Sequence, residues 1–134
     1  MLPHKILVID DNAFILKLVH DILDRYGYVV FTARTGLGGY EVACNEHPDL
    51  IILDLRLEDI GGLKVLDKIK DNNAIKAIPV AMLSSENNYH EILKSLAFGA
   101  EDYIVKPFKQ STLTKKVLRL LHRQPRAKHE FVYV

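Results

Sequence analysis

The chain has 134 residues, of which 49% are hydrophobic and 26% are charged, a composition typical of one folded domain rather than a disordered chain. Its one cysteine, Cys44, excludes a disulfide within the chain and a multi-cysteine metal site. No apolar run is long enough to span a membrane, and the first residues do not read as a signal peptide. We therefore expect a cytoplasmic protein with no membrane partner.

The net charge of +1 hides an uneven distribution of charge along the chain. Residues 109–134 carry seven Lys or Arg and one acid, whereas residues 1–108 carry 11 Lys or Arg and 16 acids. We expect a folded domain over 1–122 and a basic tail over 123–134 that ends in the apolar residues 131–134. The tail carries no nucleic-acid recognition motif, so its support for such binding is electrostatic only, and direct binding of nucleic acid is not expected.

Five short apolar runs alternate with five segments of helical periodicity. The predicted strands are residues 5–9, 28–32, 50–53, 79–83 and 102–105. The predicted helices are residues 13–26, 36–46, 63–71, 86–98 and 110–122. Most of the apolar runs lack a polar face, as strands covered on both sides of a parallel sheet do. The alternation predicts right-handed βαβ units with helices on both faces of that sheet.

Two of the predicted helices have apolar stripes that we expect to face the core. The stripe of helix 13–26 is formed by Phe14, Leu18, Ile22 and Tyr26. The stripe of helix 86–98 is formed by Tyr89, Ile92, Leu93, Leu96 and Ala97. The histidines His20, His47, His90 and His122 show no spacing that suggests a partner, and we interpret them as surface residues.

Four of the five predicted strands are followed by side chains that can bind ligands or act in catalysis. These are Asp10 and Asp11 after the first strand, Asp54 after the third, Ser84 after the fourth and Lys106 after the fifth. Ligands of open parallel sheets bind outside the carboxyl ends of the strands, so we expect these side chains to meet at one edge.

Such a group of side chains has a chemical meaning. Three neighbouring carboxylates repel one another unless a cation is present, and Mg²⁺ is a hard cation that takes oxygen ligands. A lysine and a hydroxyl at the same place can hold the oxygens of a phosphoryl group, and an aspartate can itself accept that group as an acyl phosphate. The sequence therefore predicts Mg²⁺-assisted transfer of a phosphoryl group onto an aspartate.

In order and spacing, residues 5–122 resemble the receiver domains of two-component response regulators, in the CheY-like superfamily. The motifs that carry this resemblance are Ile-Asp-Asp-Asn at 9–12, Pro-Asp-Leu-Ile-Ile-Leu-Asp-Leu at 48–55, Gly62 with its helix, Pro-Val-Ala-Met-Leu-Ser-Ser at 79–85 and Gly-Ala-Glu-Asp-Tyr-Ile-Val-Lys-Pro-Phe at 99–108. The resemblance implies a flavodoxin-like α/β fold, a doubly wound (βα)5 three-layer sandwich with the parallel strand order 2-1-3-4-5.

The resemblance assigns a phosphoacceptor and a metal site to residues of this chain. Asp54 is the implied phosphoacceptor. The implied ligands of Mg²⁺ or Mn²⁺ are Asp11, Asp54 and the backbone carbonyl of Arg56, with Asp10 bound directly or through water. The turn after Asp54 departs from the family's common Met-Pro-x-Met-Asp-Gly, because residues 57–62 read Leu-Glu-Asp-Ile-Gly-Gly. We therefore expect a different loop shape beside an otherwise complete site.

Further roles follow from the same resemblance. Ser84 is expected to hydrogen-bond the phosphoryl group and Lys106 to pair with it, and the bond between Lys106 and Pro107 is expected to be cis. Tyr103 is expected to turn inward when Ser84 moves, although a static role at the sheet edge is an equal alternative. Arg56 and Glu86 flank the phosphoryl group in this family, and their opposite charges can pair across the site, hinder water and lengthen the life of the acyl phosphate.

The resemblance also implies partners. A sensor histidine kinase or a histidine phosphotransfer protein is the implied donor, and a downstream effector protein or output domain is the implied recipient of the signal. The surface of helix 86–98, strand 102–105 and helix 110–122 is expected to switch, and a second copy of the chain is one partner that it could take. We expect a signalling phosphoacceptor rather than an enzyme that turns over an external substrate.

Two other functions remain as alternatives. One is a receiver-like interaction module that works without phosphorylation, which would bind Mg²⁺ weakly or not at all. The other is a small Mg²⁺-dependent phosphatase or phosphotransferase, a class that commonly places Asp-x-Asp after the first strand. Here that position reads Asp10-Asp11-Asn12-Ala13, and no segment supplies a substrate cap.

Overall fold

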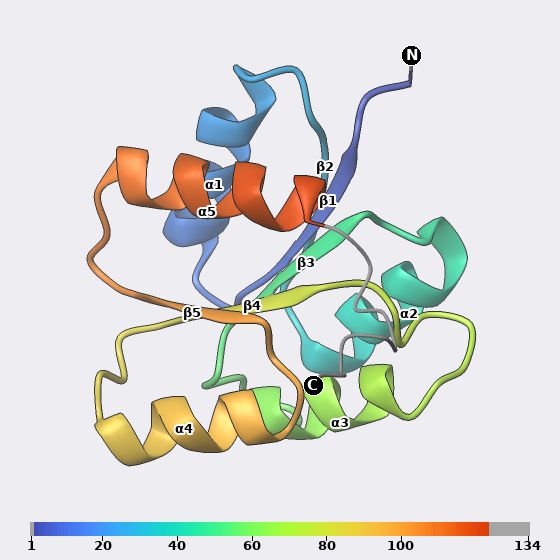
Figure 1. The fold of residues 1–134 in the computed structure, drawn as a ribbon, viewed down its shortest axis with the longest axis vertical. Helices are drawn as coiled ribbons and strands as arrows, with labels where there is room; N and C mark the ends of the chain where they lie inside the picture. Colours follow the sequence, from blue (N-terminus) through green and yellow to red (C-terminus); the bar gives the residue numbers. More distant parts are fainter. Residues whose placement is uncertain (1, 124–134) are drawn as a thin grey trace, which may run out of the picture.

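A computed structural model describes residues 2–123, in which strands and helices alternate along the chain (Figure 1). The strands are β1 (Lys5–Ile9), β2 (Val29–Ala33), β3 (Leu50–Leu53), β4 (Val80–Ser84) and β5 (Asp102–Val105). The helices are α1 (Ala13–Asp24), α2 (Gly36–Glu46), α3 (Gly62–Lys70), α4 (Tyr89–Ala97) and α5 (Gln110–His122). The predicted basic tail, apart from its first residue, lies outside the described residues.

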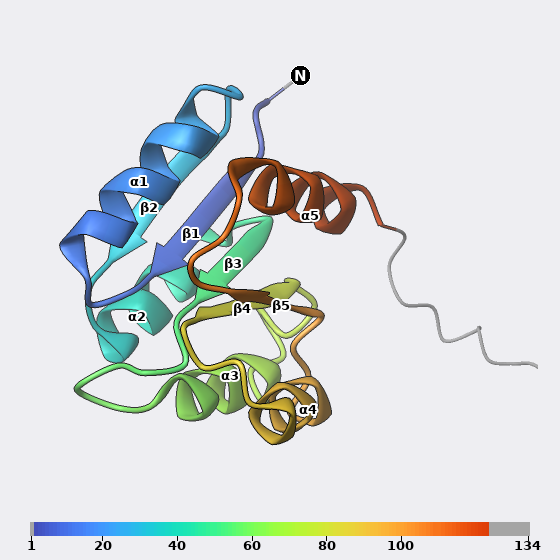
Figure 2. The same cartoon turned by 90° about the vertical axis from the view of Figure 1, so that its left-hand side faces the viewer.

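The five strands form one parallel sheet in the order β2-β1-β3-β4-β5, which confirms the predicted flavodoxin-like fold. Figure 2 shows α1 and α5 on one face of the sheet and α2, α3 and α4 on the other. The inner strand β3 is fully buried, because its alternate side chains enter the apolar clusters on both faces. Among the described residues no helix is long and apolar enough to cross a membrane.

Two strands begin one residue later than the sequence pattern predicts. In β2, the pairing with β1 begins at Val29, opposite Lys5. The strand ends at Ala33 rather than at Thr32. In β4, Pro79 has no N–H to donate to a neighbouring strand, and the strand begins at Val80. Ser84 is therefore the last residue of β4, opposite Val105 of β5, rather than the first residue after the strand.

The apolar stripe predicted for the first helix is wrong in three of its four positions. Phe14 and Tyr26 are 73% and 56% exposed and Leu18 is 38% exposed, so only Ile22 of that set is buried. The buried face of α1 consists of Leu16, Val19, Ile22 and Leu23. A repeat of four drifts by about 40° per step around a helix of 3.6 residues per turn, whereas spacings that mix three and four stay over the sheet.

The fourth helix also differs from the sequence pattern. It begins at Tyr89 rather than at residue 86, because the side chain of Asn88 caps it by accepting the His90 N–H at 2.8 Å. Its apolar residues Tyr89, Leu93 and Leu96 are exposed, and Ser95 is the one buried residue of α4. These three residues of the predicted stripe therefore face solvent instead of the core.

Candidate functional site

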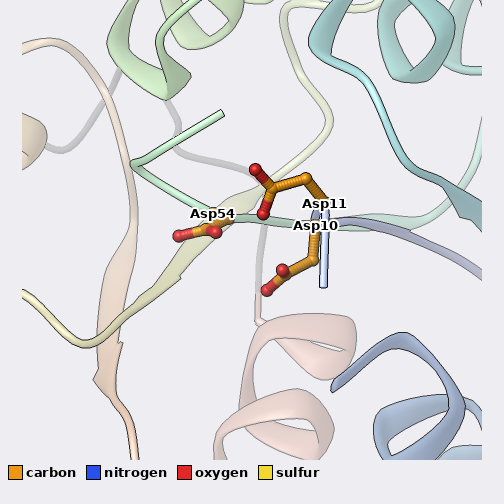
Figure 3. A group of neighbouring side chains, drawn as sticks. All are labelled: Asp10, Asp11 and Asp54. Atoms are coloured by element: carbon orange, nitrogen blue, oxygen red, sulfur yellow. The ribbon is translucent and has the colours of Figure 1, made fainter. Parts of the chain in front are cut away.

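Three carboxylates meet at the carboxyl edge of the sheet (Figure 3). Carboxylate oxygens of Asp10, Asp11 and Asp54 lie within 4.8 Å of one another. Asp10 follows β1 and Asp54 follows β3, and these strands are neighbours whose last residues, Ile9 and Leu53, are paired. The parallel register thus brings together side chains that are 44 positions apart in the sequence, as the strand-end pattern predicts.

Lys106 reaches both buried carboxylates, Asp10 and Asp54, from the end of β5. It follows β5, and its Nζ lies 2.8 Å from Asp10 Oδ2 and 3.6 Å from Asp54 Oδ2. The second oxygen of Asp10 accepts the Asn12 N–H at 2.9 Å, and Asp54 Oδ1 accepts the Arg56 N–H at 3.2 Å. The Lys106–Pro107 bond is cis, as predicted. Each carboxylate thus has a defined direction set by backbone and lysine donors.

The electrostatics of the cluster favour an additional cation. The pKa of Asp54 is raised from 3.8 to about 6, first by burial and then by the negative charge of Asp10, while Lys106 opposes the shift. Three carboxylates thus share one nearby ammonium group, and the shift of Asp54 shows that this compensation is incomplete. A set of oxygen donors with excess negative charge fits Mg²⁺ or Mn²⁺, which prefer such ligands.

A second set of contacts lies beside this cluster, between the ends of β4 and β5 and the loop after β3. Ser84 is fully buried, and its Oγ accepts the Glu86 N–H at 3.2 Å. The Tyr103 hydroxyl donates to the Glu86 carbonyl at 2.6 Å, and burial raises the pKa of this phenol. The Arg56 guanidinium meets the Glu86 carboxylate at 2.5 Å. Tyr103 already points inward in this structure, so its movement with Ser84 stays a prediction, and Arg56 and Glu86 form the ion pair that their opposite charges suggest.

The structure also reveals contacts that the sequence analysis missed. The Asp59 carboxylate accepts the backbone N–H groups of Leu37 and Gly36, both at 2.9 Å, and these bonds lower its pKa to about 2. Asp59 thus caps α2 from the loop after β3. On the opposite edge, His122 is exposed, as predicted, but its ring contacts that of His4, a partner that the spacing in the sequence does not predict. Residues so far apart in sequence leave no local pattern that could identify either contact.

Several basic side chains of the last helix and the residue after it form ion pairs, which the sequence does not suggest. Lys116 and Arg119 both pair with Asp102, and Arg123 lies 4.0 Å from Glu101. Acidic residues at the start of β5 therefore neutralise much of the positive charge that the described part of this segment carries. What remains on α5 is a mixed surface rather than a uniformly basic one.

Comparison with known proteins agrees with this geometry. A family model described as the response regulator receiver domain matches residues 6–118. The DNA-binding dual master transcriptional regulator RpaA of Synechocystis is 36% identical over 129 residues, which cover 93% of this chain and 54% of that protein. The chain spans about half the length of the curated relatives it matches.

Solved structures agree in fold. Chemotaxis protein CheY4 of Vibrio cholerae superposes with a TM-score of 0.84 at 30% identity, covering 88% of this chain and 98% of that one. The receiver domain of NtrX from Brucella abortus gives 0.83 at 33% identity, covering 89% and 99%. The motifs, the strand order and the acidic cluster all agree with the match of the family model, and the chain belongs to the response regulator receiver domain family.

Proposed function

We propose that this chain accepts a phosphoryl group on Asp54 from a phosphohistidine of a sensor histidine kinase or a histidine phosphotransfer protein. The observation that carries the proposal is the placement of Lys106 between Asp10 and Asp54 beside the third carboxylate, Asp11. In the transfer, the P–N bond to imidazole breaks and a P–O bond to an Asp54 oxygen forms. The imidazole leaves with the electron pair of the broken bond, and it leaves as the neutral ring when its second nitrogen carries a proton.

The residues at the carboxyl edge of the sheet would have distinct roles in this transfer. Asp10, Asp11, Asp54 and the Arg56 carbonyl would hold Mg²⁺, which neutralises phosphoryl oxygens when it is bound. Asp54 must be ionised to attack phosphorus, and at neutral pH it is, since its pKa is about 6. Lys106 is already within 3.6 Å of Asp54 Oδ2, so its ammonium is placed to pair with a phosphoryl oxygen attached there.

The signal would leave the site through Ser84 and Tyr103. The buried hydroxyl of Ser84 ends β4 next to the site, and Tyr103 reaches the same loop through the Glu86 carbonyl. A hydrogen bond from Ser84 to the phosphoryl group would move this loop and with it the surface of α4, β5 and α5. That surface would bind a downstream effector, an output domain or a second copy of the chain. A difference of a few kcal/mol between two states is enough for such a switch.

The contact between Arg56 and Glu86 would set the lifetime of the acyl phosphate. The two side chains come from the loops after β3 and β4, two positions beyond Asp54 and Ser84, and form an ion pair at 2.5 Å that would hinder the approach of water. Replacing both, in Arg56→Ala with Glu86→Ala, should speed the loss of phosphate by several-fold, because water reaches the phosphorus more easily. The measurement is the decay rate of phosphorylated protein after donor removal, and an unchanged rate would exclude this role.

The central test is phosphorylation by a small-molecule phosphodonor such as phosphoramidate. The wild type should gain one hydroxylamine-labile phosphate per chain when Mg²⁺ is present, and none in excess chelator. Asp54→Asn should gain none, while the control Asp49→Asn, at the opposite edge of the sheet, should behave as wild type. Phosphate retained in Asp54→Asn would reject Asp54 as acceptor. A wild type that neither binds Mg²⁺ nor takes up phosphate would favour the interaction module, and catalytic turnover of phosphate esters would favour the phosphatase.

A further inference from the structure

Two histidines that take no part in the proposed phosphoryl transfer meet at the edge of the sheet opposite the acidic cluster. His4 precedes β1, and His122 is the last residue of α5 (Figure 1). Their ring centroids are 5.5 Å apart, and the ring planes are nearly perpendicular, at 81°. The ring of Tyr28, just before β2, also lies near His4, with the ring centroids 6.4 Å apart. The fold thus joins two imidazoles from opposite ends of the described chain.

The spacing of the two rings suits a shared metal ion. A zinc ion binds imidazole nitrogens at about 2.0 Å with tetrahedral angles, which places the centres of two coordinated rings about 5 Å apart. Rotation of either side chain about its own bonds can therefore bring one nitrogen of each ring to a common ion while the backbone stays in place. His122 is exposed and His4 is half-buried, so an ion can reach both rings from solvent.

We propose that His4 and His122 bind one transition-metal ion of the Zn²⁺ class, each through one ring nitrogen, with water filling the other positions. Imidazole suits Zn²⁺, Cu²⁺ and Ni²⁺, whereas Mg²⁺ prefers carboxylate, carbonyl and water oxygens. The chain would therefore carry two metal sites of opposite preference at opposite edges of one sheet. The imidazole site is independent of the proposed phosphoryl transfer, because none of its atoms lies at the acidic edge.

A cleft beside His4 leaves room for water ligands. His4 lines a cleft of about 650 Å³ at the amino ends of the strands, together with Asp49, Leu121 and Arg123. The positive charges of this cleft are partly compensated, since Lys70 and Arg123 both face the carboxylate of Glu101, at 3.1 and 4.0 Å. With two protein ligands and this nearly balanced charge, the affinity should lie in the micromolar range rather than that of a four-ligand structural site.

A metal at this site would tie the residue before β1 to the last turn of α5, where the chain leaves the described fold. An ion that binds only the folded state stabilises it in proportion to the logarithm of its concentration above the dissociation constant. Zn²⁺ should therefore raise the melting temperature of the wild type, and the gain should persist when the acidic site is saturated with Mg²⁺.

The test is a Zn²⁺ titration of the full chain by calorimetry in saturating Mg²⁺. The wild type should bind one ion, and His4→Ala and His122→Ala should each weaken binding by about 100-fold or more, since outer-shell partners alone commonly contribute 10–100-fold. The matched control His90→Ala removes an exposed histidine of α4, and Cys44→Ser and His129→Ala remove two further side chains that could bind the ion. All three controls should bind as the wild type does.

A second measurement needs no substitution. When Co²⁺ replaces Zn²⁺, the ring resonances of His4 and His122 should shift together and before those of any other histidine. Loss of binding in His129→Ala or Cys44→Ser, or full binding in either His4→Ala or His122→Ala, would overturn the proposal. So would cobalt shifts confined to one of the two rings. Phosphorylation of Asp54 should proceed in both histidine variants, so a failure of this proposal is distinct from a failure of the proposed function.

Discussion

Asp54 is held in surroundings that disfavour its own charge. It is 5% exposed, it lies beside Asp10 and Asp11, and the ammonium group of Lys106 is closer to Asp10 than to Asp54. A carboxylate of this kind costs folding free energy whenever it is ionised without a metal. The same arrangement would keep an oxygen nucleophile available for the proposed phosphoryl transfer, at a cost in stability.

The raised pKa of Asp54 predicts how stability depends on pH. Its pKa is about 6 in the folded chain and 3.8 as the reference value, so the folded state binds more protons between these values. Stability from this group is therefore lost as pH rises from about 4 to 6, by roughly 1–3 kcal/mol. Asp54→Asn removes the charge, and in chelator it should stabilise the chain by that amount at pH 8 and by little at pH 4.

Urea unfolding of wild type and Asp54→Asn at both pH values measures this difference. Asp49→Asn is the control, because this carboxylate accepts a backbone N–H from Lys5 at 2.8 Å at the far edge of the sheet. Its effect on the free energy of unfolding should lack the pH profile expected for Asp54→Asn. Equal stabilisation by Asp54→Asn at pH 4 and pH 8 would show that the charge is not the cause.

At the scale of elements, the loop from β3 to α3, whose sequence departs from the common family pattern, has two glycines with different structural roles. Two adjacent glycines begin α3. Gly61 is its N-cap, with an extended backbone and no side-chain cap, and a Cβ there would meet no atom within 4 Å. A Cβ on Gly62 would lie 2.2 Å from the Asp54 carbonyl oxygen and 2.7 Å from the Leu55 Cα. One glycine is thus optional, and the other allows α3 to pack closely against the chain that follows β3.

Substitution of the two glycines should have opposite effects. Gly61→Asp adds a capping carboxylate and removes freedom from the unfolded chain, so it should stabilise by about 0.5–1 kcal/mol. Gly62→Ala forces the backbone after Asp54 to move and should destabilise by about 2 kcal/mol or more. Thermal unfolding gives both values, and phosphorylation rates should fall only in Gly62→Ala. A destabilised Gly61→Asp would mean that the loop does not have this shape.

At the scale of the whole molecule, the sequence predicted best those features that depend on polar residues at the ends of buried strands. The strand order, the acidic cluster and the position of Lys106 follow from parallel strands whose polar residues come directly after buried runs. The buried face of α1 did not follow, because its alternative apolar stripes differ only in how they meet the sheet. Contacts such as Asp59 with α2, or His4 with His122, depend on the folded shape and have no local signature.

The segregation of charge also takes its meaning from the whole fold. The acids of the carboxyl edge lie close together. In contrast, bases of α5 form ion pairs with Asp102, and Arg123 after the helix pairs with Glu101. Among the described residues, the acidic cluster is therefore a concentrated negative site, whereas several of the bases at the end of the chain's fold are paired with acids. Metal binding at that site should then control the stability of the entire domain rather than that of one loop, because β1 and β3 at the centre of the sheet carry the ligands.

Mg²⁺ should reverse the order of stability of the wild type and the Asp11→Asn variant. Asp11→Asn removes one of the charges that oppose the ionisation of Asp54, so in chelator the variant should be at least as stable as the wild type. The wild type should gain about 2.7 kcal/mol when Mg²⁺ reaches 100 times its dissociation constant, and the variant should gain far less. The two proteins should therefore exchange their order of melting temperature as Mg²⁺ is added. Parallel melting curves at all Mg²⁺ concentrations would mean that Asp11 is not a ligand, whereas a variant less stable even in chelator would point to a structural role for its carboxylate.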